Sequence, residues 1–77
     1  MLNKLKTDRT MKEFETRNGF KCREYFDAET SSSGIEVVDP YGDKYDLSGY
    51  TLEGFTYNGE VDEKELEEAV YEYGEAY

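Results

Sequence analysis

The sequence predicts a small α+β domain in which an antiparallel β-meander of three to four strands is packed by one C-terminal amphipathic helix. Two observations lead to this prediction. Short segments rich in aromatic and β-branched residues alternate with turn signals, which is typical of strands in a meander. Apolar residues then recur at helical spacing from Leu66 onward. The 77 residues suffice for one domain, which we expect over residues 11–77 after a loose leader of residues 1–10.

The first predicted hairpin surrounds Asn18-Gly19. Asn-Gly supplies the positive φ angles of a two-residue type I′ turn, so the segments MKEFETR and FKCREYF are expected to pair on either side of it. This register would place Glu13 opposite Glu24, which is mildly repulsive. The alternative for this region is a short helix over residues 8–17 that ends before Gly19.

The following elements are predicted from β-branched runs and turn residues. SSSG, residues 31–34, is expected to be a loop, and Ile35–Asp39 a strand because three of its residues are apolar and β-branched. The Pro-Tyr-Gly segment at 40–42 predicts a turn, after which Lys44–Leu47 returns as another strand. Residues 54–60 read as a short strand or turn.

The last predicted element is a helix that begins at Asp62. Asp62 has the character of an N-cap, Glu65 stands at the spacing of a capping box, and Val61 with Leu66 fits a hydrophobic staple. The periodicity extends to the last residues, so the helix is expected to continue there, with Tyr73 in the core and Tyr71 exposed among acids. The predicted apolar stripe comprises Leu66, Ala69, Val70, Tyr73, Ala76 and Tyr77.

Little in the sequence indicates catalysis or a bound cofactor. Histidine, the commonest general base, is absent, and Cys22 has the pattern of a small core residue. No glycine-rich phosphate loop occurs. Asp39, Asp43 and Asp46 flank a turn, and clustered carboxylates in a loop are a pattern of calcium sites. They lack EF-hand spacing, however, and are equally typical of turns. We therefore expect a protein that is not an enzyme and binds no cofactor or metal.

The charge is divided unevenly along the chain. Residues 1–26 hold seven Lys/Arg against four acids, whereas residues 27–77 hold fifteen acids against two lysines, and the net charge is −10. Such an acidic chain repels phosphate, so direct binding to nucleic acid or to an anionic membrane is not expected. A basic protein surface is the expected partner. The lone cysteine and the missing signal and membrane segments favour a cytoplasmic location.

The helix carries more acid than its stability requires. The pairs Glu63/Glu67 and Glu68/Glu72 are like charges one turn apart, and each costs about 0.2–0.5 kcal/mol. Acids near the helix C-terminus also oppose the helix dipole. We therefore predict that an acidic, tyrosine-bearing surface binds the partner and imitates a row of phosphates. The predicted partner-binding residues are Glu67, Glu68, Tyr71, Glu72, Glu75, Asp39, Asp43 and Asp46.

This profile resembles that of small acidic proteins made by bacteriophages against host defence, including nucleic-acid mimics of the anti-restriction and anti-CRISPR kinds. The likeness lies in size, the acidic residues 27–77 and the abundance of tyrosine, and it includes no alignable motif. It implies a stoichiometric inhibitor in the bacterial host cytoplasm. The inhibitor would act as a monomer or homodimer and cover the basic nucleic-acid-binding surface of a defence nuclease such as a Cas effector. The alternative is a small adaptor or regulatory module whose acidity serves solubility.

Overall fold

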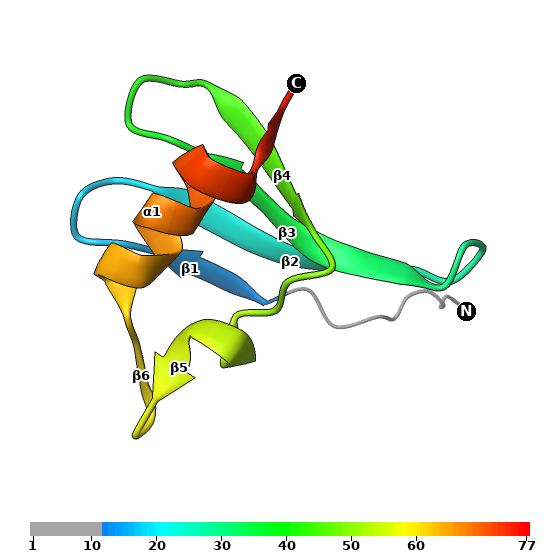
Figure 1. Ribbon diagram of the computed structural model, residues 1–77, viewed down its shortest axis with the longest axis horizontal. Helices are drawn as coiled ribbons and strands as arrows, with labels where there is room; N and C mark the ends of the chain where they lie inside the picture. The colour runs from blue at the N-terminus through cyan, green and yellow to red at the C-terminus, as the bar shows by residue number, and fades with distance from the viewer. Residues whose placement is uncertain (1–11) are drawn as a thin grey trace, which may run out of the picture.

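The computed structural model describes residues 12–77 and contains a five-stranded antiparallel sheet with one helix across it (Figure 1). The α+β prediction is confirmed, and the expected leader of residues 1–10 lies outside the described residues. The sheet has the order β1-β2-β3-β4-β7, so that its first four strands form the predicted meander. These strands are β1 (Glu13–Glu15), β2 (Lys21–Asp27), β3 (Ser32–Val38), β4 (Lys44–Ser48) and β7 (Glu75–Ala76).

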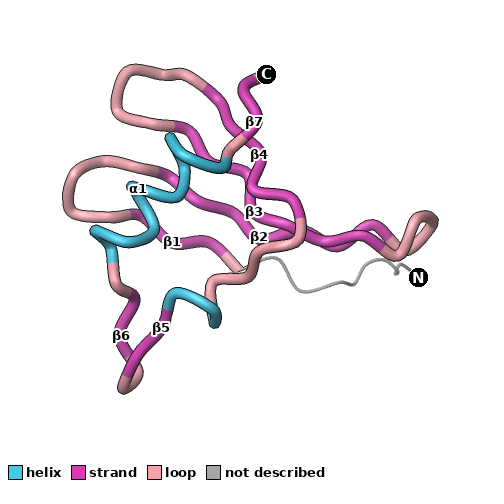
Figure 2. Tube along the Cα trace, in the orientation of Figure 1, coloured by secondary structure: helices cyan, strands magenta, loops and turns pink. Residues whose placement is uncertain are grey.

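The segment between β4 and β7 contains the remaining elements (Figure 2). A short 3₁₀ helix, η2 (Glu53–Phe55), leads into a two-stranded ribbon of β5 (Thr56–Tyr57) and β6 (Glu60–Val61). The helix α1 (Glu63–Tyr73) follows and packs on the sheet, and the chain then returns to pair with β4. The predicted short strand or turn over residues 54–60 is therefore a hairpin.

The β1–β2 hairpin forms, but with a longer loop than the predicted two-residue turn. Thr16 accepts a backbone hydrogen bond from Gly19 at 3.0 Å, and within this loop only Gly19 has a positive φ, at 94°. This geometry fits a three-residue loop. The register consequently places Glu13 opposite Arg23 instead of Glu24, which turns the expected repulsion into attraction. The Asn-Gly pair with positive φ at both residues is Asn58-Gly59, between β5 and β6.

The expected loop at residues 31–34 is wrong, because β3 already begins at Ser32. Gly34 is buried in β3 opposite Tyr25, and a Cβ atom at Gly34 would lie 2.6 Å from the Tyr25 hydroxyl oxygen. The phenol ring therefore crosses a strand position that only glycine leaves open. Because β2 continues to Asp27 and β3 begins at Ser32, the β2–β3 hairpin extends well past the helix (Figure 1).

The helix begins as predicted. The side chain of Asp62 accepts a hydrogen bond from the Glu65 backbone N–H at 3.1 Å, and partly buried Val61 packs against the core that contains Leu66. The capping box is not reciprocal, because the Asp62 N–H donates to Phe55 instead.

One hydrophobic core lies between α1 and the sheet. From α1 it takes Leu66, Ala69 and Val70, as predicted, but not Tyr73, whose side chain is 57% exposed and stacks on Tyr50. The expectation that Tyr73 belongs to the core is therefore wrong. The core comprises Phe20, Cys22, Ile35, Val37, Leu47, Leu52, Phe55, Leu66, Ala69 and Val70.

Candidate protein-interaction surfaces

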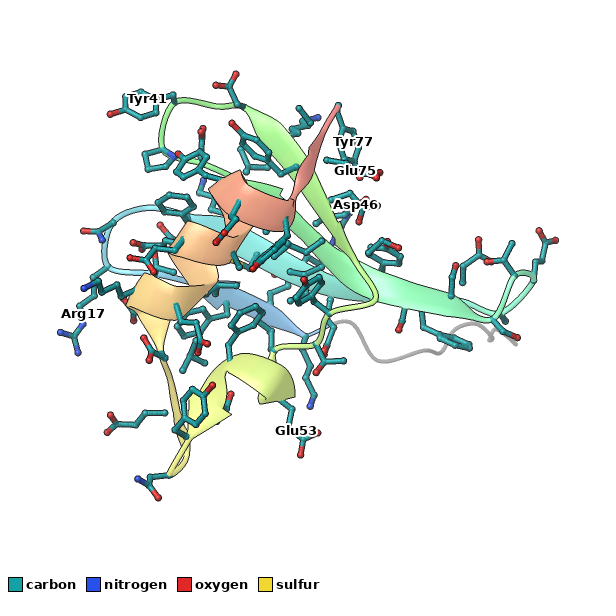
Figure 3. All side chains as sticks on the ribbon, in the orientation of Figure 1. Arg17, Tyr41, Asp46, Glu53, Glu75 and Tyr77 are labelled. Carbon is teal, nitrogen blue, oxygen red and sulfur yellow. The ribbon has the colours of Figure 1, made fainter. Side chains whose placement is uncertain are left out.

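The row of acidic residues predicted along the helix is interrupted at Gly74, where α1 ends. A Cβ atom at Gly74 would collide with the carbonyl oxygen of Val70 and lie 3.2 Å from Cβ of Tyr45, so the close approach of helix and sheet requires glycine here. Glu75 therefore leaves the helix and lies on β7 opposite Asp46 of β4. Figure 3 shows both acids at this edge of the sheet, near Tyr77. The expected continuation of the helix to the last residues is wrong.

Two helix acids hold the β1–β2 loop. Glu67 accepts hydrogen bonds from the side-chain amide of Asn18 at 3.0 and 3.2 Å, and Glu63 accepts one from the backbone N–H of Arg17 at 3.0 Å. The predicted site residue Glu67 thus has an internal role, because it fixes the loop against α1.

Tyr71 lies half-exposed at the side of α1, with 53% of its surface accessible. Its ring meets those of Phe20 and Tyr45 edge-on at centroid distances of 5.7 and 5.5 Å, and its hydroxyl donates to Oδ2 of Asp39 at 3.0 Å. Desolvation first, and the hydrogen bond to Asp39 second, raise the pKa of Tyr71 to about 12. Tyr71 is thus attached to its neighbours, and its use as an interface anchor stays a prediction.

Asp39 lies inside the β3–β4 turn and not on the surface, because only 4% of it is accessible. Its Oδ1 accepts the backbone N–H groups of Tyr41 at 3.0 Å and Asp43 at 2.9 Å. The turn predicted at residues 40–42 is therefore confirmed, with Asp39 as its organising carboxylate. Asp43 is exposed in this turn, beside Tyr41, which is 85% exposed.

A group of exposed acids lies on the outer side of α1 and on the segment that leads into it. We name this set the acidic face. Glu68 and Glu72 are exposed one turn apart, which is about 6 Å along the helix axis. Glu65 lies on the same side and accepts the Tyr57 hydroxyl at 2.8 Å. Of the described residues, the acidic face comprises Glu60, Asp62, Glu65, Glu68 and Glu72, together with the cation Lys64.

A second polar surface covers the side of the sheet away from α1, named here the open sheet face. Arg23 forms an ion pair with Glu36 at 2.7 Å, and the Tyr77 hydroxyl lies 3.3 Å from the other oxygen of Glu36. The hydroxyl of Tyr25 donates to Asp46 at 2.8 Å. Desolvation first, with the hydrogen bond to Asp46 next, raises the pKa of Tyr25 to about 12.

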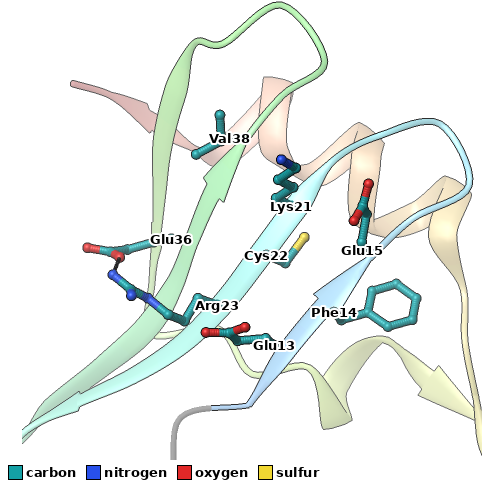
Figure 4. Close-up of a pocket in the computed structure, with 8 residues that line it drawn as sticks. All are labelled: Glu13, Phe14, Glu15, Lys21, Cys22, Arg23, Glu36 and Val38. Atoms are coloured by element: carbon teal, nitrogen blue, oxygen red, sulfur yellow. Dashed lines mark hydrogen bonds and ion pairs between the residues drawn. The ribbon is translucent and has the colours of Figure 1, made fainter.

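Acids and cations interleave on the open sheet face. Strand alternation places Lys21, Arg23 and Lys44 there among the acids of the same strands. A shallow groove of about 380 Å³ lies over β1, β2 and β3 on this side (Figure 4). Its lining residues are Glu13, Phe14, Glu15, Lys21, Cys22, Arg23, Glu36 and Val38.

The structure thus divides the eight predicted site residues among three places. Glu68 and Glu72 lie on the acidic face. Asp46 and Glu75 lie on the open sheet face. The rest gather around the β3–β4 turn and the β1–β2 loop: Asp39, Asp43, Glu67 and Tyr71. Sequence reasoning missed Glu36 and Tyr77, whose approach depends on β7 pairing with β4.

Within residues 12–77 no group of three His, Cys, Asp or Glu side chains is arranged to hold a metal ion. In the same part of the chain, no helix has the length and apolar character needed to cross a membrane. No known protein family matches the sequence, no curated protein is detectably similar to it, and no solved structure matches the fold.

Proposed function

We propose that this protein is a stoichiometric inhibitor that covers the basic nucleic-acid-binding surface of a host defence nuclease in the bacterial cytoplasm. The observation that carries the proposal is the acidic face. Among residues 12–77, the acidic face holds five exposed carboxylates and Lys64, whereas Lys21, Arg23 and Lys44 lie among acids on the open sheet face and Arg17 lies in the β1–β2 loop beside Glu63. The acidic face is therefore the surface that a basic partner meets most favourably.

The spacing of the helix acids supports imitation of a nucleic-acid backbone. Glu68 and Glu72 lie about 6 Å apart along the axis of α1, so two carboxylates occupy successive turns of one helix, as charges succeed one another along a nucleic-acid strand. Lysine and arginine side chains arranged for phosphates would meet carboxylates in their place. Tyr57, half-exposed beside Glu65, adds a flat aromatic side chain of the kind that anchors interfaces.

The test is capture of the partner followed by charge reversal at two positions. The tagged protein should retain a nucleic-acid-binding protein from a bacterial lysate, and DNA or guide RNA should compete with it. In the variant Glu68→Lys/Glu72→Lys we expect affinity to fall by at least about tenfold. Within residues 12–77 these two exposed side chains make no hydrogen bond or ion pair, so the variant should keep its secondary structure.

The matched control is Glu29→Lys/Glu75→Lys, which changes the charge equally at exposed positions away from the acidic face. This control should keep most of the affinity at equal salt. Equal losses in the two variants would show that net charge alone acts, and the acidic face would then lose its role. An affinity that does not change between low and high salt would instead favour the adaptor alternative.

A further inference from the structure

The outer edge of β1 offers backbone groups for one more strand. Thr16 donates to Phe20 and Glu24 donates to Lys12 across the β1–β2 pair. Because hydrogen-bonded and non-hydrogen-bonded pairs alternate in an antiparallel ladder, the N–H and C=O groups of Glu13 and Glu15 point away from β2. Among residues 12–77 no strand pairs with this edge.

The side chains along this edge specify the charge of what can pair there. On the open sheet face, Glu13 lies opposite Arg23 and Glu15 opposite Lys21, both on β2. Opposite charges directly across two strands stabilise a sheet, whereas like charges destabilise it. An added strand therefore meets two carboxylates and favours cations at two positions separated by one residue. A second copy of β1 is disfavoured, because an antiparallel pair in this register would oppose acid to acid.

The residue between the two acids sets the third requirement. Phe14 points to the core side, lies opposite Cys22 and is only partly buried against the core cluster. A neighbouring apolar side chain on an added strand would cover more of its ring. The row across the sheet would then run from this apolar residue through Phe14 and Cys22 to Val37.

We propose that the β1 edge binds an extended segment of a partner protein that carries basic, apolar and basic residues in succession. The backbone of the segment pairs with Glu13 and Glu15, its basic side chains lie over the groove, and its apolar residue packs on Phe14. The strand β2 presents this same pattern to β1 from the other side, as Lys21-Cys22-Arg23. This interaction surface is separate from the acidic face and does not depend on the proposed inhibitor function.

The experiment titrates a peptide with the core Lys-Leu-Lys, flanked by serine and threonine, into the isotopically labelled protein. Amide NMR signals of Glu13 and Glu15 should shift more than those of α1. A peptide of equal composition with the order Lys-Lys-Leu is the control for unspecific attraction to an acidic protein. It should bind at least about fivefold more weakly, because its cations do not share one face.

Two variants separate strand addition from simple charge attraction. Glu13→Pro removes one outward N–H and the carboxylate but no hydrogen bond to β2, and proline is tolerated on sheet edges, so it is compared with Glu13→Gln, which removes the carboxylate alone. We expect Glu13→Pro to keep the circular dichroism spectrum and to bind the peptide at least about tenfold more weakly than Glu13→Gln. Glu13→Lys/Glu15→Lys should prefer a Glu-Leu-Glu peptide over Lys-Leu-Lys, a reversal that a merely destabilised fold would not produce.

Several results would overturn the proposal. The largest shifts could fall on α1, or the two peptides could bind equally well. Glu13→Pro could bind like Glu13→Gln. Replacing Leu5 of this chain by proline, which changes no charge, could raise the affinity for the peptide severalfold, which would show that the chain's own Lys4-Leu5-Lys6 occupies the edge instead of a partner.

Discussion

Replacement of Asp39 by alanine tests whether one buried carboxylate joins the β3–β4 turn to the helix. Its two oxygens accept three hydrogen bonds, two from the backbone of the turn and one from the hydroxyl of Tyr71 on α1. Asp39→Ala removes all three at once. Asp39→Asn is the conservative partner, because an amide has the same shape and keeps an oxygen for the turn.

The expected magnitude follows from these three bonds. A hydrogen bond to a charged group contributes about 1.5–3 kcal/mol when its donor is buried, and less when water can replace it. Tyr41, Asp43 and Tyr71 are all exposed residues, so about 1 kcal/mol for each bond is appropriate. Asp39→Ala should thus lower the free energy of unfolding by about 3 kcal/mol, which corresponds to roughly 15 °C in Tm for a domain of this size.

The assay is urea and thermal unfolding followed by circular dichroism, combined with Tyr71→Phe in a double-mutant cycle. Tyr71→Phe should cost about 1 kcal/mol in the unchanged protein and almost nothing in Asp39→Ala, because the partner is already gone. Asp39→Asn should fall between the unchanged protein and Asp39→Ala. A loss below about 1 kcal/mol for Asp39→Ala, or additive losses in the cycle, would refute the role assigned to this carboxylate.

Three further predictions concern titration, backbone space and a thiol. The pKa values of Tyr25 and Tyr71 are raised from 10.0 to about 12, so the folded state holds protons that the unfolded state releases. The stability that these tyrosines contribute should therefore be complete below pH 10 and be lost as pH rises towards 12, with a shallower loss in Tyr71→Phe when urea midpoints are compared. Gly74→Ala should cost about 2 kcal/mol in thermal unfolding, because its methyl group meets the Val70 carbonyl oxygen. Burial, and to a lesser degree the charge of Glu67, raise the pKa of the Cys22 thiol to about 11, so mass spectrometry at pH 8 should find Cys22 alkylated by iodoacetamide in urea but not in the native protein.

Local signals in the sequence predicted the elements whose formation depends on neighbouring residues. The N-cap at Asp62, the turn after Asp39 and the β-branched strand that follows Gly34 belong to this group. The Asn-Gly signal was ambiguous, since the two copies of this dipeptide adopt different loops. The loop after Thr16 is a residue longer than an Asn-Gly turn, and the resulting register brings Glu13 to Arg23. The residues of the loop alone do not indicate that Glu13 pairs with Arg23.

The candidate site was harder to predict. Helical periodicity gives the direction in which a side chain points, but it does not show how closely neighbouring elements approach that side chain. Tyr71 points away from the sheet by periodicity, yet the rings of Phe20, next to β2, and Tyr45 of β4 meet its ring edge-on, and Asp39 of the β3–β4 turn accepts its hydroxyl. Tyr73 points towards the sheet, yet it lies at the last turn and stays largely exposed. Glu75 lies on a different surface from the predicted one, because Gly74 ends the helix and β7 pairs with β4. This pairing depends on the tertiary structure.

The order of strands has a consequence for how quickly the native state is reached. From β1 to β4 every strand pairs with the next one along the chain, so these contacts close short loops and cost little chain entropy. Among the strands of residues 12–77, only the β4–β7 pair spans the ribbon and the helix. Folding on a timescale of about milliseconds is expected for such a topology, with β7 closing last. The strand that carries Glu75 is then also the first to detach when the protein opens locally, ahead of the meander.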